Sequence, residues 1–257
     1  MRRTLLLFGL SFLLAIALAF AVRSSVRTTE VSADELAPRT AEEVAAEGRA
    51  LGFEPIEVER QAALIRRPVS GHAWVVYWGG NTSAYFHEAL QTIEGLRLPS
   101  DVGVLIIAPP GYDSEGPASP FELERAAVNT RQWLRREERA ERIVTGGFSL
   151  GTYSALVAAE RDVVGTFLMG ASPRFEVNER GPLVRLRAPD AYEVKPTPPR
   201  VPALVIQGGK DDVRHGRQVA QWLGAKFVLV PGVTHADTQR SDTVLRAVRD
   251  FVEVALQ

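Results

Sequence analysis

The sequence predicts an α/β protein in which a mostly parallel sheet is covered by helices on both faces. Three observations predict this class. From about residue 55 onward, short β-branched runs alternate with longer helix-like stretches. The pattern Gly147-Phe148-Ser149-Leu150-Gly151 stands between one such run and a helical stretch. An acidic pair and then a histidine follow, each just after a later strand-like run.

The first helix of this domain is predicted from a capping box, Thr40-Ala41-Glu42-Glu43, which opens an alanine-rich stretch ending near Gly52. After it, the alternation is typical of parallel strands joined by helices. We expect strands near 55–60, 62–67, 73–78, 102–108, 142–146, 163–169, 202–207 and 226–230. We expect helices over 83–96, 120–138 and 152–160, and another that starts near His215.

The G-x-S-x-G pattern around Ser149 predicts a nucleophile elbow, the sharp turn that holds a serine at the end of a strand. The two glycines allow the sharp turn and remove side chains that would block a substrate. The backbone N–H of Leu150 then lies at a helix N-terminus, where it can stabilise a developing oxyanion. An ordinary glycine-rich turn is the alternative, and the placement between strand and helix disfavours it.

Candidate partners of the serine follow two later strands. The predicted strand at 202–207 leads to Asp211 and Asp212, and the strand at 226–230 leads to His235. Because the carboxyl ends of parallel strands meet at one edge of a sheet, we expect these side chains near Ser149. His235 would accept the serine proton, and an acid on its other ring nitrogen would fix the tautomer.

In this order of residues the chain resembles the α/β-hydrolase superfamily, from about Pro55 to the end. It is most similar to an esterase-like branch that has an HGN-type loop and an RGYGxSxG-type loop. The resembling stretches here are Tyr77-Trp78-Gly79-Gly80-Asn81-Thr82 and Pro109-Pro110-Gly111-Tyr112-Asp113-Ser114-Glu115-Gly116. The resemblance implies an α/β-hydrolase fold, a Ser-His-acid triad and an oxyanion hole that includes the backbone N–H of Asn81. Two positions depart from the branch: Gly79 replaces its histidine and Pro110 its arginine.

Two neighbouring residues compete for the role of the acid. In the family, the acid falls two residues before the valine of a G-x-x-D-x-V-like turn, which favours Asp211. Asp212 is then a solvated turn residue or the cap of the following helix. The other histidines are weaker candidates: His72 is expected in a loop, His87 within a helix and His215 on the surface.

Composition excludes several classes of function. The chain has no Cys, which excludes a thiol nucleophile, disulfides and Cys-based metal sites. It also lacks the H-E-x-x-H, phosphate-loop and dinucleotide-binding patterns, so we expect neither a metal nor a cofactor. The formal charge of −1 and the absence of a concentrated basic run argue against a nucleic-acid partner.

The N-terminus predicts export. Arg2-Arg3 precede an uncharged apolar run over residues 4–22 that contains the small-residue pattern Ala17-Leu18-Ala19-Phe20-Ala21. Cleavage after Ala21 would release the protein, whereas a run of this length could also remain as a membrane anchor. We therefore expect a signal peptide or anchor over 1–22, a polar linker over 23–39 and one catalytic domain over 40–257.

The leading functional hypothesis is a serine hydrolase that cleaves a small-molecule ester or thioester through an acyl-enzyme on Ser149. It would work outside the cytoplasmic membrane, either free or attached through residues 4–22. Residues 171–200 break the strand–helix alternation, so they form either a short lid or a plain surface connection. A noncatalytic, envelope-associated binding domain that keeps the fold is the alternative. The intact triad candidates argue against it, and the two departures noted above argue for it.

Overall fold

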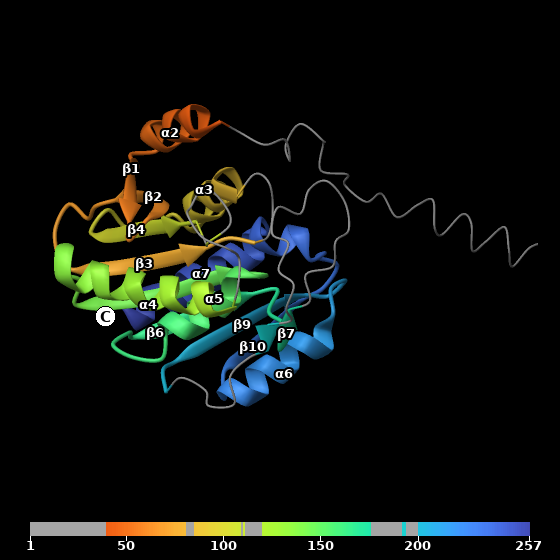
Figure 1. Ribbon diagram of the computed structural model, residues 1–257. Coiled ribbons are helices and arrows are strands. Elements are labelled where there is room, and N and C mark those ends of the chain that lie inside the picture. The colour runs from red at the N-terminus through yellow and green to blue at the C-terminus, as the bar shows by residue number, and fades with distance from the viewer. Residues whose placement is uncertain (1–39, 81–84, 109, 111–119, 176–191, 194–199) are drawn as a thin grey trace, which may run out of the picture. The chain divides into compact units, whose positions relative to one another are not determined.

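A computed structural model of the 257-residue chain is shown in Figure 1. It describes residues 40–80, 85–108, 110, 120–175, 192–193 and 200–257, all of which belong to one compact unit, Ala37–Gln257. The expected export segment and linker lie outside the described residues. Within the described ranges, no helix has the length and apolar character that a membrane crossing requires.

The main sheet has eight strands in the order β1-β2-β4-β3-β5-β6-β9-β10. Its strands are β1 (Glu54–Val58), β2 (Gln61–Arg66), β3 (Ala73–Trp78), β4 (Val102–Ile107), β5 (Arg142–Phe148), β6 (Gly165–Met169), β9 (Ala203–Gly208) and β10 (Lys226–Val230). From β4 to β10 every neighbouring pair is parallel, whereas β2 is antiparallel to both β1 and β4. The predicted mostly parallel sheet is therefore confirmed.

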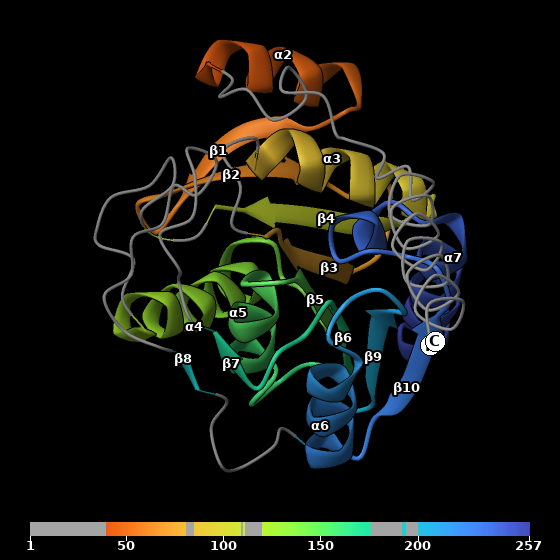
Figure 2. The ribbon, with the colours of Figure 1, turned by 90° about the vertical axis from the view of Figure 1, so that its right-hand side faces the viewer.

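Helices cover both faces of this sheet, as Figures 1 and 2 show. They are α2 (Ala41–Ala50), α3 (Tyr85–Leu96), α4 (Pro120–Glu137), α5 (Gly151–Ala158), α6 (Val213–Leu223) and α7 (Asp242–Ala255), with a short 3₁₀ helix η1 (Ala236–Gln239). α3 and α7 pack together on one face, and α4, α5 and α6 lie on the other. The predicted capping box is confirmed, because Thr40 and Glu43 cap α2 reciprocally.

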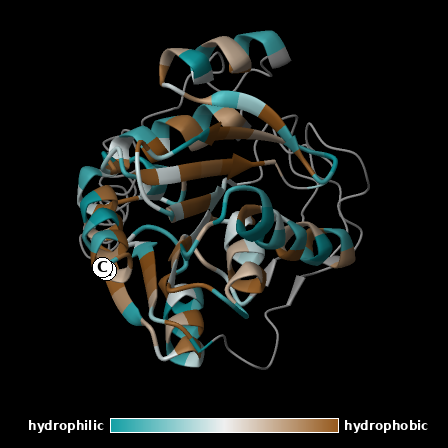
Figure 3. Cartoon of the chain, turned by 90° about the vertical axis from the view of Figure 1, so that its left-hand side faces the viewer, coloured by the Kyte–Doolittle hydropathy of each residue, from teal (hydrophilic) through white to brown (hydrophobic). Residues whose placement is uncertain are grey.

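The core lies between the sheet and these two helix layers. The middle strands β3 and β4 are buried along their whole length, which explains their continuous apolar runs. In Figure 3, apolar residues accordingly concentrate on the central strands and polar residues lie along the outer sides of the helices. Trp74, Tyr77, Trp78 and Phe167 are among the largest side chains that are fully buried. This packing holds in place the strands whose carboxyl ends lie next to the candidate site residues.

Several element boundaries differ by one or two residues from the sequence prediction, among them those of β1 and β6. Strand β1 ends at Val58, and Glu59 and Arg60 form the turn to β2 with φ values of 49° and 71°. Positive φ at both positions is typical of the two-residue hairpin turn that suits the strand twist. Strand β6 begins at Gly165, two residues later than expected.

The segment expected to form a lid or a surface connection contains a second, small sheet. Strands β7 (Arg174–Phe175) and β8 (Tyr192–Glu193) pair antiparallel within it. Residues 176–191 and 194–199 lie outside the described residues. The lid therefore stays a prediction.

Candidate active site

The site lies where the strand order reverses. From β3 the chain continues to β4 on one side of β3 and then returns to β5 on its other side. In open parallel sheets, ligands bind at the carboxyl ends of the strands on either side of such a switch point. β3 leads into Gly79 and Gly80, and β5 leads into Ser149, so the predicted oxyanion loop and the elbow both begin at this switch point.

Ser149 holds an unusual backbone conformation directly after β5. Its φ of +50° lies in the left-handed region, which non-glycine residues seldom occupy. Such a residue costs about 1–3 kcal/mol and persists only where its surroundings impose it. Here the Ser149 N–H donates to Met169 O at 2.9 Å, and the Ser149 carbonyl accepts from the Thr152 N–H at 3.0 Å and from Thr152 Oγ1 at 2.6 Å. These hydrogen bonds hold Ser149 in its unfavourable backbone conformation.

The two elbow glycines serve a purpose other than the one expected from the sequence. Neither has a positive φ, so the sharp turn is made by Ser149. A Cβ on Gly147 would lie 2.2 Å from Gly151 O, and one on Gly151 would lie 2.0 Å from Trp78 O. The glycines therefore let α5 approach the ends of β5 and β3.

The acid and the histidine come together after the last two strands. Asp211 follows β9 and His235 lies in the turn between β10 and η1. His235 Nδ1 lies 2.7 Å from Asp211 Oδ2, and the other carboxylate oxygen, Oδ1, accepts from the Asp212 N–H at 2.7 Å. The His235 side chain remains 44% exposed, whereas that of Asp211 is only 15% exposed. One ring nitrogen of an accessible imidazole is thus held by a half-buried carboxylate.

Asp211 is in its ionised form at neutral pH. Burial opposes the charge, but the hydrogen bond and the positive charge available from His235, together with the Asp212 N–H, outweigh it and hold the pKa of Asp211 below its ordinary value. An ionised carboxylate only accepts hydrogen bonds, so His235 must donate from Nδ1. Its Nε2 is then the nitrogen left to act as a base.

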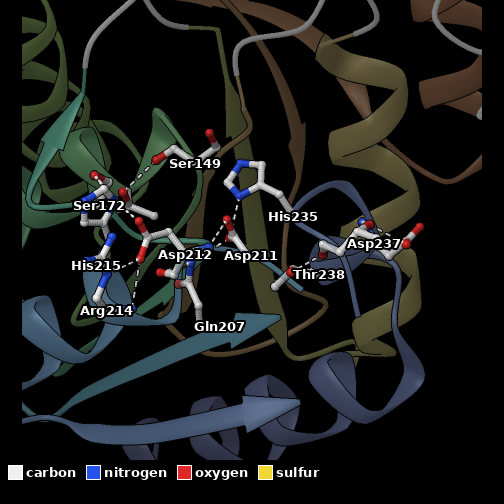
Figure 4. Close-up of polar contacts among 12 residues, drawn as sticks. Ser149, Ser172, Gln207, Asp211, Asp212, Arg214, His215, His235, Asp237 and Thr238 are labelled. Carbon is white, nitrogen blue, oxygen red and sulfur yellow. Dashed lines mark hydrogen bonds and ion pairs between the residues drawn. The ribbon is translucent and has the colours of Figure 1, made fainter. Parts of the chain in front are cut away.

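Figure 4 shows the Ser149 side chain beside the imidazole of His235, on the side of the ring away from Asp211. Two neighbours shape the space that the ring occupies. The ring of Phe148 packs against it with centroids 4.9 Å apart, and a Cβ on Gly170 would lie 2.8 Å from its Cε1 atom. No hydrogen bond joins Ser149 to His235 in the described part of the chain, and such contacts commonly tighten only when substrate binds.

Of the two candidate donors to the oxyanion, Leu150 and Asn81, only Leu150 lies among the described residues. Leu150 is the N-cap residue of α5, and the first N–H groups of a helix have no intrahelical acceptor. Asn81 lies outside the described residues. Its neighbour Gly80 is described, and a Cβ there would lie 3.5 Å from Ser149 Cβ, so the loop after β3 begins against the elbow.

A second group of a serine, a histidine and an aspartate lies next to Asp211, and the sequence analysis did not predict it. His215 Nδ1 lies 3.4 Å from Ser172 Oγ and 3.7 Å from Asp212 Oδ2 (Figure 4). A proton relay needs the serine and the acid on opposite nitrogens of the ring, whereas here both face Nδ1. Asp212 also serves as the N-cap of α6, accepting from the Arg214 N–H, which was one of its two predicted roles.

The remaining histidines lie elsewhere. His72 is exposed just before β3, and His87 joins α3 to α2 through Glu47 at 2.7 Å. Sequence reasoning missed Gln207, a buried residue near the end of β9 whose side chain contacts Asp211. A polar residue inside an otherwise apolar strand, four residues before the acid, was the signal that could have found it.

Comparisons with known proteins identify the fold. No family model and no curated protein sequence matches the chain. Solved structures do match, among them a predicted CIB-like hydrolase from Thermoplasma acidophilum, with a TM-score of 0.59 and 15% identity over 79% of this chain and 97% of that one. A dienelactone hydrolase from Anabaena variabilis gives a TM-score of 0.56 and 16% identity over 80% and 97% of the two chains.

A third match is a Xanthomonas campestris protein described as an α/β serine hydrolase without lid. It gives a TM-score of 0.53 and 16% identity over 78% of this chain and 92% of that one. At such low identity the likeness is one of fold. The strand order, the helices on both faces and these neighbours agree, and the chain therefore has the α/β-hydrolase fold.

Proposed function

We propose that the chain is a serine hydrolase that cleaves a small-molecule ester or thioester. One observation carries the proposal: a serine with positive φ lies beside an imidazole whose far nitrogen is held by an ionised carboxylate. Positive φ at a non-glycine residue is costly, and strain of this kind clusters at functional sites. The three side chains also come from the carboxyl ends of three parallel strands, where ligands bind in this class of sheet.

In the acylation step, Ser149 Oγ attacks the acyl carbonyl carbon while His235 Nε2 takes the hydroxyl proton. The carbonyl oxygen gains the electron pair and becomes an oxyanion. The N–H of Leu150 at the start of α5 and the N–H of Asn81 are the proposed donors to it. The C–O or C–S bond to the leaving group then breaks, and His235 returns its proton to the departing alcohol or thiol.

In the deacylation step, a water molecule replaces the alcohol. His235 takes one proton from the water as its oxygen attacks the acyl carbonyl, and Ser149 leaves with that proton. Throughout, Asp211 keeps the Nδ1 proton on the ring and stabilises the imidazolium. The 44% exposure of the His235 side chain is compatible with the entry of water.

A panel of p-nitrophenyl esters and acyl thioesters of graded acyl length tests the proposal on the full-length chain. We expect turnover with at least one acyl length, and loss of several orders of magnitude in Ser149→Ala. Folded protein without turnover on any member would favour the noncatalytic binding domain. Equal turnover by wild type and Ser149→Ala would reject the assignment of the nucleophile.

We also propose that the protein works outside the cytoplasmic membrane, as a released enzyme or one anchored through residues 4–22. The support is the sequence pattern alone: Arg2-Arg3, the apolar run and the small residues up to Ala21. The catalytic chemistry proposed above needs neither a cofactor nor a disulfide, so it is compatible with that location.

A further inference from the structure

The buried amide side chain of Gln207 is unfavourable for the stability of the fold. It is the second-last residue of β9 and only 2% exposed. Its Nε2 group donates to Asp211 Oδ2 at 2.6 Å and lies 3.3 Å from the carbonyl oxygen of Asp212. Among the described residues, its buried Oε1 atom has no hydrogen-bond partner. A buried carbonyl oxygen without a donor is unfavourable, so an apolar residue would suit this strand better.

The orientation of the Gln207 amide follows from its neighbours. Both nearby oxygens, one of an ionised carboxylate and one of a peptide carbonyl, can only accept hydrogen bonds. The NH₂ group must therefore face Asp211. The other end of the amide lies against Gly216, which leaves room for it, because a Cβ at that position would come within 2.6 Å of Oε1.

The amide thus donates to the same oxygen, Oδ2, that receives His235 Nδ1. Oδ1 is held by the Asp212 N–H. Together these two neutral donors fix the plane of the carboxylate before the histidine binds to it. His235 lies in a turn and its side chain is 44% exposed, so a carboxylate held in place at Nδ1 adds to the packing of Phe148 in orienting the ring.

We propose that Gln207 is a positioning residue of the Ser149-His235-Asp211 triad: its amide holds the Asp211 carboxylate so that His235 keeps its Nδ1 proton and presents Nε2 to Ser149. This inference rests on the proposed function. Gln207 touches no reacting atom and acts only through Asp211.

The test measures the rate at which a fluorophosphonate probe labels Ser149 in the full-length chain, as a function of pH. Gln207→Met keeps the volume of the side chain and removes the donor. Gln207→Glu keeps the shape and makes the donor titratable. When protonated, the introduced carboxyl can donate to Asp211 as the amide does, and when ionised it repels Asp211.

Gln239 supplies a matched control. It is also 2% exposed, also has an unpartnered Oε1 among the described residues, and donates to a different carboxylate, Glu88, at 3.3 Å. Gln239→Met and Gln239→Glu therefore repeat both substitutions at equal burial without touching Asp211. Substitutions at Gln207 leave unchanged the other charged groups near Asp211, which are Asp212, Arg214 and His215 at the start of α6 and Asp237 on η1.

We expect Gln207→Met to label roughly tenfold or more slowly than wild type, by analogy with the loss of a hydrogen-bond partner behind a metal-binding histidine. The ratio of the Gln207→Glu rate to the wild-type rate should fall as pH rises, while both Gln239 ratios stay flat. Rates are normalised to the folded fraction from circular dichroism at each pH. If Gln207→Met does not fold, the pH dependence of the Gln207→Glu ratio decides alone.

A Gln207→Glu ratio that is constant with pH, or Gln207→Met labelling at the wild-type rate, would overturn the positioning role. Wild-type protein that is not labelled at Ser149 is a different result, because it rejects the proposed function itself. The two failures are therefore distinguishable within one experiment.

Discussion

At the scale of single residues, the two adjacent aspartates differ in what they contact. Asp211 holds His235 Nδ1, whereas Asp212 caps α6 and lies near His215. We expect Asp211→Asn to lower kcat/KM by several orders of magnitude, because an amide no longer fixes the tautomer or stabilises the imidazolium. Asp212→Asn should change kcat/KM by only a few-fold, since Asn is an equally good N-cap. Ester hydrolysis by both variants checks the ranking, and the reverse order would move the acid role to Asp212.

The lowered pKa of Asp211 leads to a second prediction, on how the stability of the fold depends on pH. Because the folded-state pKa lies below the ordinary value of 3.8, the ionised carboxylate stabilises the fold above that pH. This stabilisation is lost as pH falls through the folded-state pKa. Urea unfolding should therefore show a larger gap between wild type and Asp211→Asn near neutral pH than in strong acid. A gap that widens on acidification would contradict the lowered pKa.

At the scale of elements, the elbow depends on close backbone contacts. A Cβ on Gly151 would overlap the Trp78 and Gly79 carbonyl oxygens, neither of which belongs to a flexible side chain. We expect Gly151→Ala to lower the free energy of unfolding by about 3 kcal/mol, with loss of esterase activity as β5 and α5 separate. Gly48→Ala is the control, because its Cβ would come no closer than 3.3 Å to any atom, the nearest being the movable end of Leu64. Denaturant unfolding of both variants gives the comparison, and equal stability would argue against the close approach.

The β1–β2 hairpin is a site where a substitution should stabilise the protein. Glu59 and Arg60 both take positive φ, which costs a non-glycine residue about 1 kcal/mol. Arg60→Gly removes that cost, and we expect the free energy of unfolding to rise by roughly 0.5–1 kcal/mol. The substitution does not alter the exposed Glu59–Arg136 ion pair, which in any case contributes little to stability. A lower melting temperature in Arg60→Gly would show that the turn does not have this geometry.

These elements also show what the sequence could and could not predict. The alternation of strands and helices was readable because each buried strand is a continuous apolar run, as in β3 and β4. The Glu59-Arg60 turn was not, since its residues lack the Asn-Gly signature of such turns. The order of Ser149, Asp211 and His235 pointed to one sheet edge. The Ser172–His215 contact escaped because it joins side chains of separate elements. Gln207 lies only four residues before Asp211, and its polar side chain in an apolar strand was the signal that was missed.

At the scale of the whole molecule, the apolar run before the α/β-hydrolase domain predicts processing. Three small-residue registers between Ala15 and Ala21 favour cleavage, while the length of the run favours retention. We expect the protein expressed in its own host to begin at Val22. N-terminal sequencing checks this, and Met1 as the first residue would mean an anchored enzyme. A C-terminal reporter that is accessible only from the cytoplasm would reject export.

The central claim, that Ser149 is an activated nucleophile, is tested most directly by locating the adduct of a fluorophosphonate. The full-length chain is labelled, digested and analysed by mass spectrometry, with Ser149→Ala and His235→Ala as controls. We predict one phosphonylated serine, Ser149, with labelling abolished in Ser149→Ala and slowed by several orders of magnitude in His235→Ala. Folded protein that carries no adduct on Ser149, or carries it on Ser172 instead, would contradict the account.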